Sequence, residues 1–188
     1  MEQFAHDLLR LGGPDLKSYR TDGQSFADYY AYGQPVLAAA AGTVVGMADS
    51  EGEDLSAMRK MGESMDAYMR RLQGEQMVRL SKGLRGLVGN YVMIDHGNGE
   101  FSLYAHLKPK SVTVKLDQKL ALGDVVGALG SSRNSTEPHL HFQVCNGPDP
   151  LMCAGIPPTW RGLGFSFDDF PRAPQSGDML YDLQTPKD

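Results

Sequence analysis

Short apolar runs separated by glycine, asparagine and aspartate dominate the chain from residue 35 onward. Four of them, 35–46, 89–107, 111–132 and 138–144, are rich in β-branched and aromatic residues. This texture is typical of short β-strands bounded by turns. Asn98-Gly99 divides the second run, and this dipeptide favours a tight hairpin turn. We therefore expect an antiparallel β protein in which the two halves of 89–107 pair with each other.

A different periodicity occupies about residues 54–84. Apolar residues recur there at intervals of three and four, the spacing of one face of an α-helix. Acidic residues precede the segment and basic residues follow it, an order that complements the helix dipole. The pattern predicts one helical insertion in a β domain, with a methionine-rich face that packs on the core. The face consists of Leu55, Met58, Met61, Met65, Tyr68, Met69 and Leu72.

The length of 188 residues suits one domain, so we assign 1–188 to a single mainly β, sandwich-like unit. After residue 141 the sequence becomes rich in proline and polar residues. We expect a last strand near Gly164 to Phe170 and a loose C-terminal tail over 171–188.

Composition excludes some classes of partner. The formal charge is -5, whereas nucleic-acid and anionic-membrane binders usually carry a basic patch, so we expect no nucleic-acid ligand. No stretch approaches 18 consecutive apolar residues, and the first ten residues lack the pattern of a signal peptide. We expect neither a membrane span nor an export signal in this sequence.

The two cysteines, Cys145 and Cys153, flank a turn-rich segment that could bring them together. Two readings stay open at this point. An oxidised pair would suit an extracytoplasmic compartment, whereas two unpaired, buried thiols would say nothing about the compartment.

Histidines carry the candidate chemistry. His139 and His141 alternate within a β-rich run, so both imidazoles should project from the same face of the strand. His106 lies near the end of a second predicted strand. Neutral imidazole serves both as a metal ligand and as an acid or base. We interpret His96, just ahead of the hairpin turn, as structural.

At these histidines the sequence resembles a known family. The segments GNYVMIDHGNGEFSLYAHLKP and LGDVVGALGSSRNSTEPHLHFQV are similar to the core of the lysostaphin-type (LytM-like) zinc metallopeptidases, and the resemblance covers about 33–144 outside the helical segment. It implies that His141 binds Zn²⁺ and that His106 and His139 assist catalysis. It also implies peptides of bacterial peptidoglycan as substrate and an extracytoplasmic location.

The sequence departs from the family at its first metal motif, His-x-x-x-Asp, because no histidine stands four residues before an aspartate. In the placement that we prefer, Asp7 is the ligand and Gln3 takes the histidine position. The third ligand is then His6, a residue preceding Met1, or absent. Adjacent His6 and Asp7 would face opposite sides of a regular strand. The alternative uses Asp28, with Gln24 in the histidine position.

Two functions follow from the resemblance. The first is a zinc metalloendopeptidase in which metal-activated water hydrolyses peptide bonds of peptidoglycan. The second is a catalytically degenerate LytM-like module that binds peptidoglycan or regulates a cell-wall amidase. The retained histidines favour the first function and the missing motif favours the second.

Overall fold

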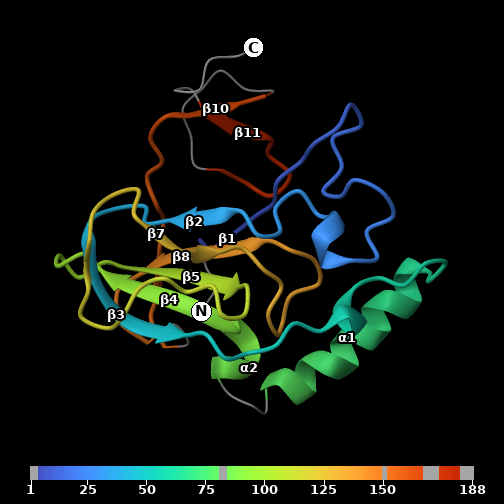
Figure 1. Cartoon of the computed structure of the whole chain (residues 1–188), viewed down its shortest axis with the longest axis horizontal. Coiled ribbons are helices and arrows are strands. Elements are labelled where there is room, and N and C mark those ends of the chain that lie inside the picture. The colour runs from blue at the N-terminus through green and yellow to red at the C-terminus, as the bar shows by residue number, and fades with distance from the viewer. Residues whose placement is uncertain (1–3, 81–83, 150–151, 167–173, 183–188) are drawn as a thin grey trace.

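A seven-stranded antiparallel sheet forms the centre of the molecule (Figure 1). The computed structural model describes residues 4–80, 84–149, 152–166 and 174–182. The main sheet has the strand order β1-β8-β5-β4-β3-β6, with β9 also paired to β8, so the mainly β prediction is confirmed. Its strands are β1 (His6–Leu8), β3 (Gly42–Ala48), β4 (Asn90–Asp95), β5 (Phe101–Leu107), β6 (Lys119–Leu120), β8 (Leu140–Cys145) and β9 (Gly155–Ile156).

Two small sheets accompany the large one. β2 (Pro35–Leu37) pairs with β7 (Val125–Ala128), and β10 (Leu163–Phe165) pairs with β11 (Leu180–Asp182). The segment from Val112 to Lys115, within the predicted run 111–132, is not a strand, because only β6 and β7 form there.

The predicted hairpin is confirmed as β4 and β5, in which Asp95 is paired with Phe101. Gly97 and Gly99 in the turn both have φ of 82°, the left-handed region that glycine enters without steric cost. His96 lies beside this turn, with Nδ1 2.8 Å from the carbonyl of Ala41 and Nε2 2.9 Å from Ser102 Oγ. These contacts agree with the structural interpretation of His96.

The main hydrophobic core lies between the large sheet and the β2–β7 pair. Val92, Tyr104 and Phe142 from the large sheet contact a cluster that includes Val36 and Val126 from the small one. Tyr104 also links the two layers by a hydrogen bond, because its hydroxyl accepts from the Ala39 N–H at 2.8 Å. The position of β5 and β8, the strands that carry the candidate histidines, is thereby fixed.

The helical segment begins later than predicted. Residues Leu55–Ala57 form only a 3₁₀ turn, which the Asp54 side chain caps, and α1 runs over Met65–Leu80. Gly62 has φ of 74°, which interrupts a helix, and Ser64 Oγ accepts from the Ala67 N–H at the start of α1. A second helix, α2, spans Leu84–Val88, and residues 81–83 lie outside the described residues.

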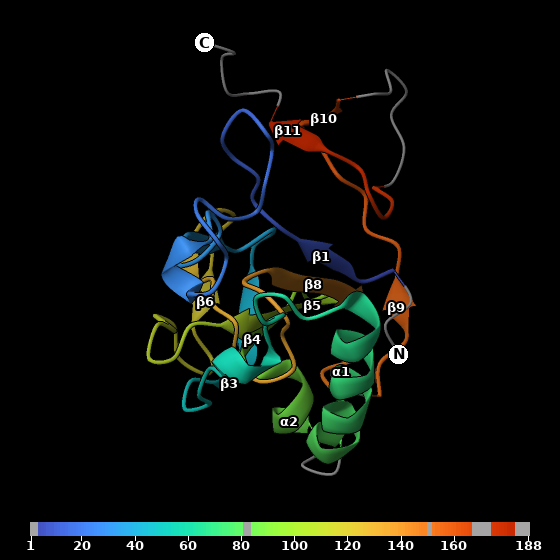
Figure 2. The same ribbon diagram turned by 90° about the vertical axis from the view of Figure 1, so that its right-hand side faces the viewer.

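The methionine-rich face does not pack on the core as predicted. Met58 is buried, but Met61, Met65 and Met69 are 76%, 54% and 47% exposed. Helix α1 lies at the periphery of the molecule, beside the segment that follows β1, rather than across the sheet (Figures 1 and 2). The packing prediction is therefore wrong for these three methionines.

The C-terminal predictions are met in part. β10 covers the start of the expected strand, whereas 167–170 lie outside the described residues. The prediction of a loose tail is wrong at Leu180–Asp182, because these residues form β11 against β10. The remaining ends of that range, 171–173 and 183–188, also lie outside the described residues.

Cys145, the last residue of β8, and Cys153 form a disulfide, so the reading with an oxidised pair is the correct one.

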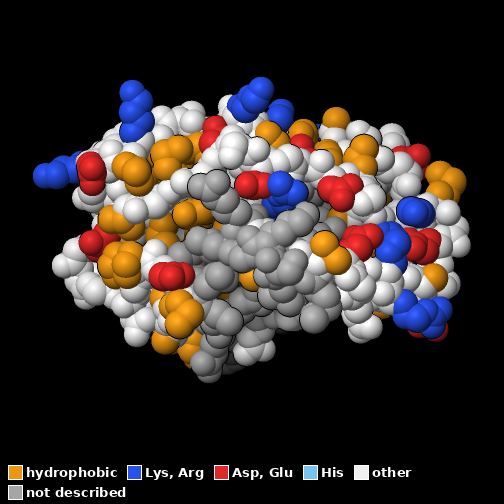
Figure 3. Space-filling model, turned by 90° about the horizontal axis from the view of Figure 1, so that it is seen from below, with side chains coloured by type: hydrophobic (Ala, Val, Ile, Leu, Met, Phe, Trp, Pro, Cys, Tyr) orange, Lys and Arg blue, Asp and Glu red, His pale blue; other side chains and the backbone are white. Residues whose placement is uncertain are grey.

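Among the described residues, no helix combines the length and the apolar character needed to cross a bilayer. The face shown in Figure 3 carries basic and acidic side chains interspersed with each other rather than one continuous basic area.

Candidate active site

His139 and His141 lie at the start of β8 and reach the same place. His139 directly precedes the strand and His141 is its second residue. Their rings lie 4.8 Å and 5.9 Å from the ring of His106, measured between centroids. The expectation that both imidazoles face the same side holds, and His106 joins them from β5.

Asp7 reaches these histidines through strand pairing. β1 pairs with β8 so that Asp7 lies opposite His141. Asp7 Oδ1 is 2.9 Å from His141 Nδ1 and 3.5 Å from His139 Nε2. One carboxylate and three imidazoles from β1, β5 and β8 therefore converge. The Asp7 side chain is 61% exposed, so the cluster opens to solvent on that side.

His106 adopts an unusual backbone conformation at the end of β5. Its φ is 62°, in the left-handed region that residues other than glycine seldom adopt. Asn90 pairs with Leu107 and Val92 with Tyr104, so Ala105 and His106 lie opposite the single residue Tyr91 and form a bulge in β5. The bulge and the positive φ turn the His106 side chain toward His139 and His141 rather than continuing the strand alternation.

A serine loop holds the His106 ring. The carbonyl oxygen of Ser132 lies 3.0 Å from His106 Nδ1, and the Ser132 hydroxyl accepts from the Asn90 N–H at 2.9 Å. Gly89 allows this close approach, because a Cβ atom there would lie 2.6 Å from the Ser132 carbonyl oxygen. The buried Asn90 side chain in turn donates to the carbonyls of Glu51 and Leu107.

These supporting residues were not identified from the sequence. By pattern alone, Gly89-Asn90 and the Gly-Ser-Ser run ending at Ser132 indicate only parts of strands and turns. The only sequence signal for these supporting residues is a glycine followed by a polar residue at the start of a buried strand, together with a second run of small residues. It does not reveal which distant backbone the glycine approaches.

The hydrogen bonds fix which ring nitrogens carry protons. His139 Nδ1 lies 2.8 Å from the Glu137 carbonyl, and His106 Nδ1 faces the Ser132 carbonyl. A carbonyl oxygen only accepts, so Nδ1 carries the proton in the neutral form of each ring. Each ring is then left with an unprotonated Nε2, which can accept a proton or bind a metal ion.

Burial and hydrogen bonding give His106 and Asp7 different charges near pH 7. Burial, followed by the neighbouring His139 and His141, lowers the pKa of His106 to about 3, so this ring is neutral near pH 7. The hydrogen bond from His141 lowers the pKa of Asp7, so this side chain is a carboxylate. The site therefore combines an anionic oxygen with a neutral imidazole.

The alternative ligands lie elsewhere. His6 is paired with Phe142 and its ring packs against Trp160 at 5.4 Å, on the face of β1 opposite Asp7. The Asp28 carboxylate accepts from the N–H groups of Thr21 and Gly23 and so closes a loop. The structure thus brings Asp7 to the histidines but neither His6 nor Asp28, while Gln3 lies outside the described residues.

The cluster fits a metal ion only in part. Asp7 Oδ1 and His141 Nδ1 are donor types that zinc prefers, and they face each other. Catalytic zinc usually has three protein ligands, however, and no group of three histidine, cysteine, aspartate or glutamate side chains among the described residues has the geometry to hold a metal ion. The described residues thus offer two facing donors, and a third ligand is not assigned.

Comparisons with known proteins agree with this site. The profile of peptidase family M23 matches residues 75–152, the part that contains His106, His139 and His141. A DD-carboxypeptidase/endopeptidase of Neisseria meningitidis is 45% identical over 63 residues, which are 34% of this chain and 14% of that protein. The peptidoglycan DD-endopeptidase ShyA of Vibrio cholerae is 41% identical over 71 residues, or 37% of this chain and 16% of that protein.

The catalytic domain of lysostaphin from Staphylococcus simulans is a similar solved structure. It is 18% identical with a TM-score of 0.42, and the alignment covers 80% of this chain and 85% of that domain. The curated relatives are much longer than the segments matched, so their activities are not transferred by similarity alone. The segment 75–152, which carries the three histidines, therefore resembles peptidase family M23, in agreement with the expected likeness to the lysostaphin-type (LytM-like) peptidases.

Proposed function

We propose that this chain is a metal-dependent endopeptidase that hydrolyses peptide bonds of bacterial peptidoglycan. The observation that carries the proposal is the convergence of Asp7 with His106, His139 and His141, from three strands, at a place open to solvent. A purely structural role would not explain three imidazoles and a carboxylate gathered at an exposed sheet end. The names of the M23 relatives point to peptidoglycan as substrate and to an extracytoplasmic location.

Asp7 and His141 are the residues that would hold the metal ion. Their facing oxygen and nitrogen atoms are 2.9 Å apart, so small side-chain shifts would let both hold one ion once the proton of the hydrogen bond leaves His141 Nδ1. A bound zinc ion would supply Lewis-acid activation of water and of the substrate carbonyl.

His139 would handle the proton, while His106 would help to hold the water. Burial keeps His106 neutral near pH 7, so its Nε2 would accept a hydrogen bond from the water. His139 donates through Nδ1 to a backbone carbonyl, so its Nε2, which faces the Asp7 carboxylate, can accept the proton of the attacking water. Once protonated, the same nitrogen can donate to the leaving amine. The backbone contacts hold both rings in this tautomer throughout, so no ring rotation is required.

Zinc content and hydrolysis together test the proposal. We expect about one zinc per chain by elemental analysis and release of peptide fragments from purified peptidoglycan. Asp7→Ala and His141→Ala should lose both, whereas His139→Gln should keep zinc and lower kcat by about 10²- to 10⁴-fold. His96→Asn serves as the matched histidine control and should leave both unchanged. Metal-replete parent protein that holds no zinc and cleaves no peptidoglycan would overturn the proposal.

His6→Ala addresses the third ligand. Because His6 faces Trp160 on the other side of β1, we expect this variant to keep its zinc. Loss of zinc in His6→Ala would mean that β1 rearranges when the metal ion binds.

One observation favours the second candidate function, a module that binds peptidoglycan or regulates a cell-wall amidase without hydrolysis. The described residues provide two facing metal donors rather than three. Such a module would bind insoluble peptidoglycan without releasing fragments. Co-sedimentation with peptidoglycan in the absence of zinc and of hydrolysis would support it over the peptidase.

A further inference from the structure

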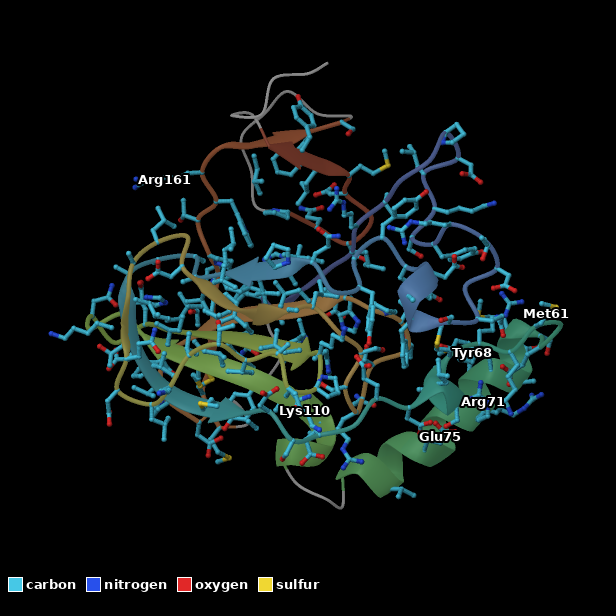
Figure 4. All side chains as sticks on the ribbon, in the orientation of Figure 1. Met61, Tyr68, Arg71, Glu75, Lys110 and Arg161 are labelled. Carbon is cyan, nitrogen blue, oxygen red and sulfur yellow. A yellow bond between two sulfur atoms is a disulfide. The ribbon has the colours of Figure 1, made fainter. Side chains whose placement is uncertain are left out.

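A cavity of about 470 Å³ lies near the histidine cluster. Three segments that are distant in sequence enclose it: the loop 18–29, the turn 59–62 with the start of α1, and Thr136-Glu137. The exposed Met61 and Met65 line it, so two of the methionines that do not pack on the core have a place here. In Figure 4, Met61 and Tyr68 mark the α1 side of the cavity.

Glu137 connects this cavity to the candidate active site. Its side chain lines the cavity and accepts a hydrogen bond from Ser18 Oγ at 2.9 Å. Its backbone carbonyl is the group that lies 2.8 Å from His139 Nδ1. Glu137 therefore contacts the cavity through its side chain and the proposed catalytic ring through its backbone.

Charges of both signs line the cavity on different segments. Arg59 and Lys60 come from the turn before α1, whereas Asp22 and Glu137 come from the two other segments. Arg59 uses Nε to donate to the Glu63 carbonyl, and no described carboxylate forms an ion pair with the side chains of Arg59 or Lys60. Cationic groups from one segment and carboxylates from the two others are thus available to a ligand.

Aromatic rings complete the lining. Tyr19, Tyr29 and Tyr68 contribute flat apolar surface together with polar hydroxyl groups. Tyr29 donates its hydroxyl to the Gly23 carbonyl at 3.1 Å, and Gln24 Nε2 donates to the Arg59 carbonyl at 3.2 Å. The second of these bonds ties the loop 18–29 to the turn 59–62 before any ligand binds, which reduces the entropy cost of binding.

We propose that this cavity is a recognition subsite for a short peptide segment that carries both a free ammonium and a free carboxylate group. The carboxylate would lie against Arg59 and Lys60, and the ammonium against Asp22 and Glu137. This inference rests on the proposed function, because it assigns the segment to the peptide that the site cleaves. Ligand pockets of about 300–1,000 Å³ with a few placed charges are typical of small-molecule and peptide sites.

Calorimetric titration with trialanine, its N-acetyl form and its C-terminal amide tests the charge requirement. We expect trialanine to bind the parent protein at least about tenfold more tightly than either blocked form, because each block removes one charge-assisted contact. Arg59→Gln/Lys60→Gln should lose the preference for a free carboxylate, and Glu137→Gln the preference for a free ammonium. Arg161→Gln, an exposed arginine far from the cavity in Figure 4, is the matched control. Equal binding of all three peptides would overturn the proposal.

The same titration in His141→Ala separates the two proposals. Selective trialanine binding in parent and His141→Ala, with no hydrolysis by either, would uphold the subsite and refute the peptidase. Hydrolysis of peptidoglycan with KM unchanged in Arg59→Gln/Lys60→Gln would uphold the peptidase and refute the subsite. The subsite predicts instead that KM rises about tenfold in this variant while kcat is maintained.

Discussion

Replacing Gly89 by alanine should damage both the stability of the fold and the candidate site. Gly89 has φ of 63°, and forcing an alanine into that region costs about 1–2 kcal/mol. The new Cβ would also lie 2.6 Å from the Ser132 carbonyl oxygen, so backbone must shift. Overpacking of this kind costs a further amount of about 1–3 kcal/mol. We expect a total loss of about 2–5 kcal/mol in the free energy of unfolding.

Gly123→Ala is the matched control for this prediction. Gly123 has φ of 86°, but no atom lies within 4 Å of a Cβ built there, so only the backbone cost applies. Urea unfolding of the two variants therefore isolates the contact with Ser132. Because that carbonyl holds His106 Nδ1, hydrolysis by Gly89→Ala should also fall, whereas hydrolysis by Gly123→Ala should not. Equal stability losses in the two variants would refute the argument that close approach requires Gly89.

Three further predictions concern other parts of the molecule. Reduction of the Cys145–Cys153 disulfide, which closes a short loop, should lower the free energy of unfolding by about 2–3 kcal/mol, and Cys145→Ala/Cys153→Ala should be insensitive to reductant in the same urea assay. The pKa of His106 is lowered to about 3 in the fold from 6.5, so the unfolded chain binds the proton first; its contribution to stability is complete above pH 6.5 and declines as the pH falls toward 3. Unfolding followed from pH 7 to pH 4 should show a shallower loss in His106→Asn than in the parent. Tyr104→Phe should cost about 1–2 kcal/mol in thermal unfolding, because it leaves the Ala39 N–H without its acceptor, and an undiminished Tm would contradict this role.

The sequence was most informative where the signal is local. The Asn98-Gly99 turn predicted the β4–β5 hairpin, and alternation in β8 predicted that His139 and His141 face the same side. Both inferences need only the conformation of a few consecutive residues. The opposite orientations of His6 and Asp7 followed from the same strand geometry, once β1 was assumed to be a strand.

Features that depend on distant contacts were not predictable in this way. A glycine is required at position 89 because the Ser132 backbone, 43 positions along the chain, approaches it closely. The bulge that turns His106 depends on the pairing of β4 with β5. The start of α1 was missed for a different reason. The spacing of Leu55, Met58 and Met61 matches a helical face, but the Asp54 cap and Gly62 divide the segment into a 3₁₀ turn and a later helix.

The position of β1 has a consequence for the order in which the site assembles. β5 and β8 are flanked by other strands, whereas β1 is a three-residue strand at the border of the sheet, paired only with β8. Local opening of such an edge needs less free energy than global unfolding. The histidines thus stand on the persistent part of the fold, and Asp7 joins them only while β1 is docked. A ligand that bridges Asp7 and His141 would therefore also stabilise the pairing of β1 with β8.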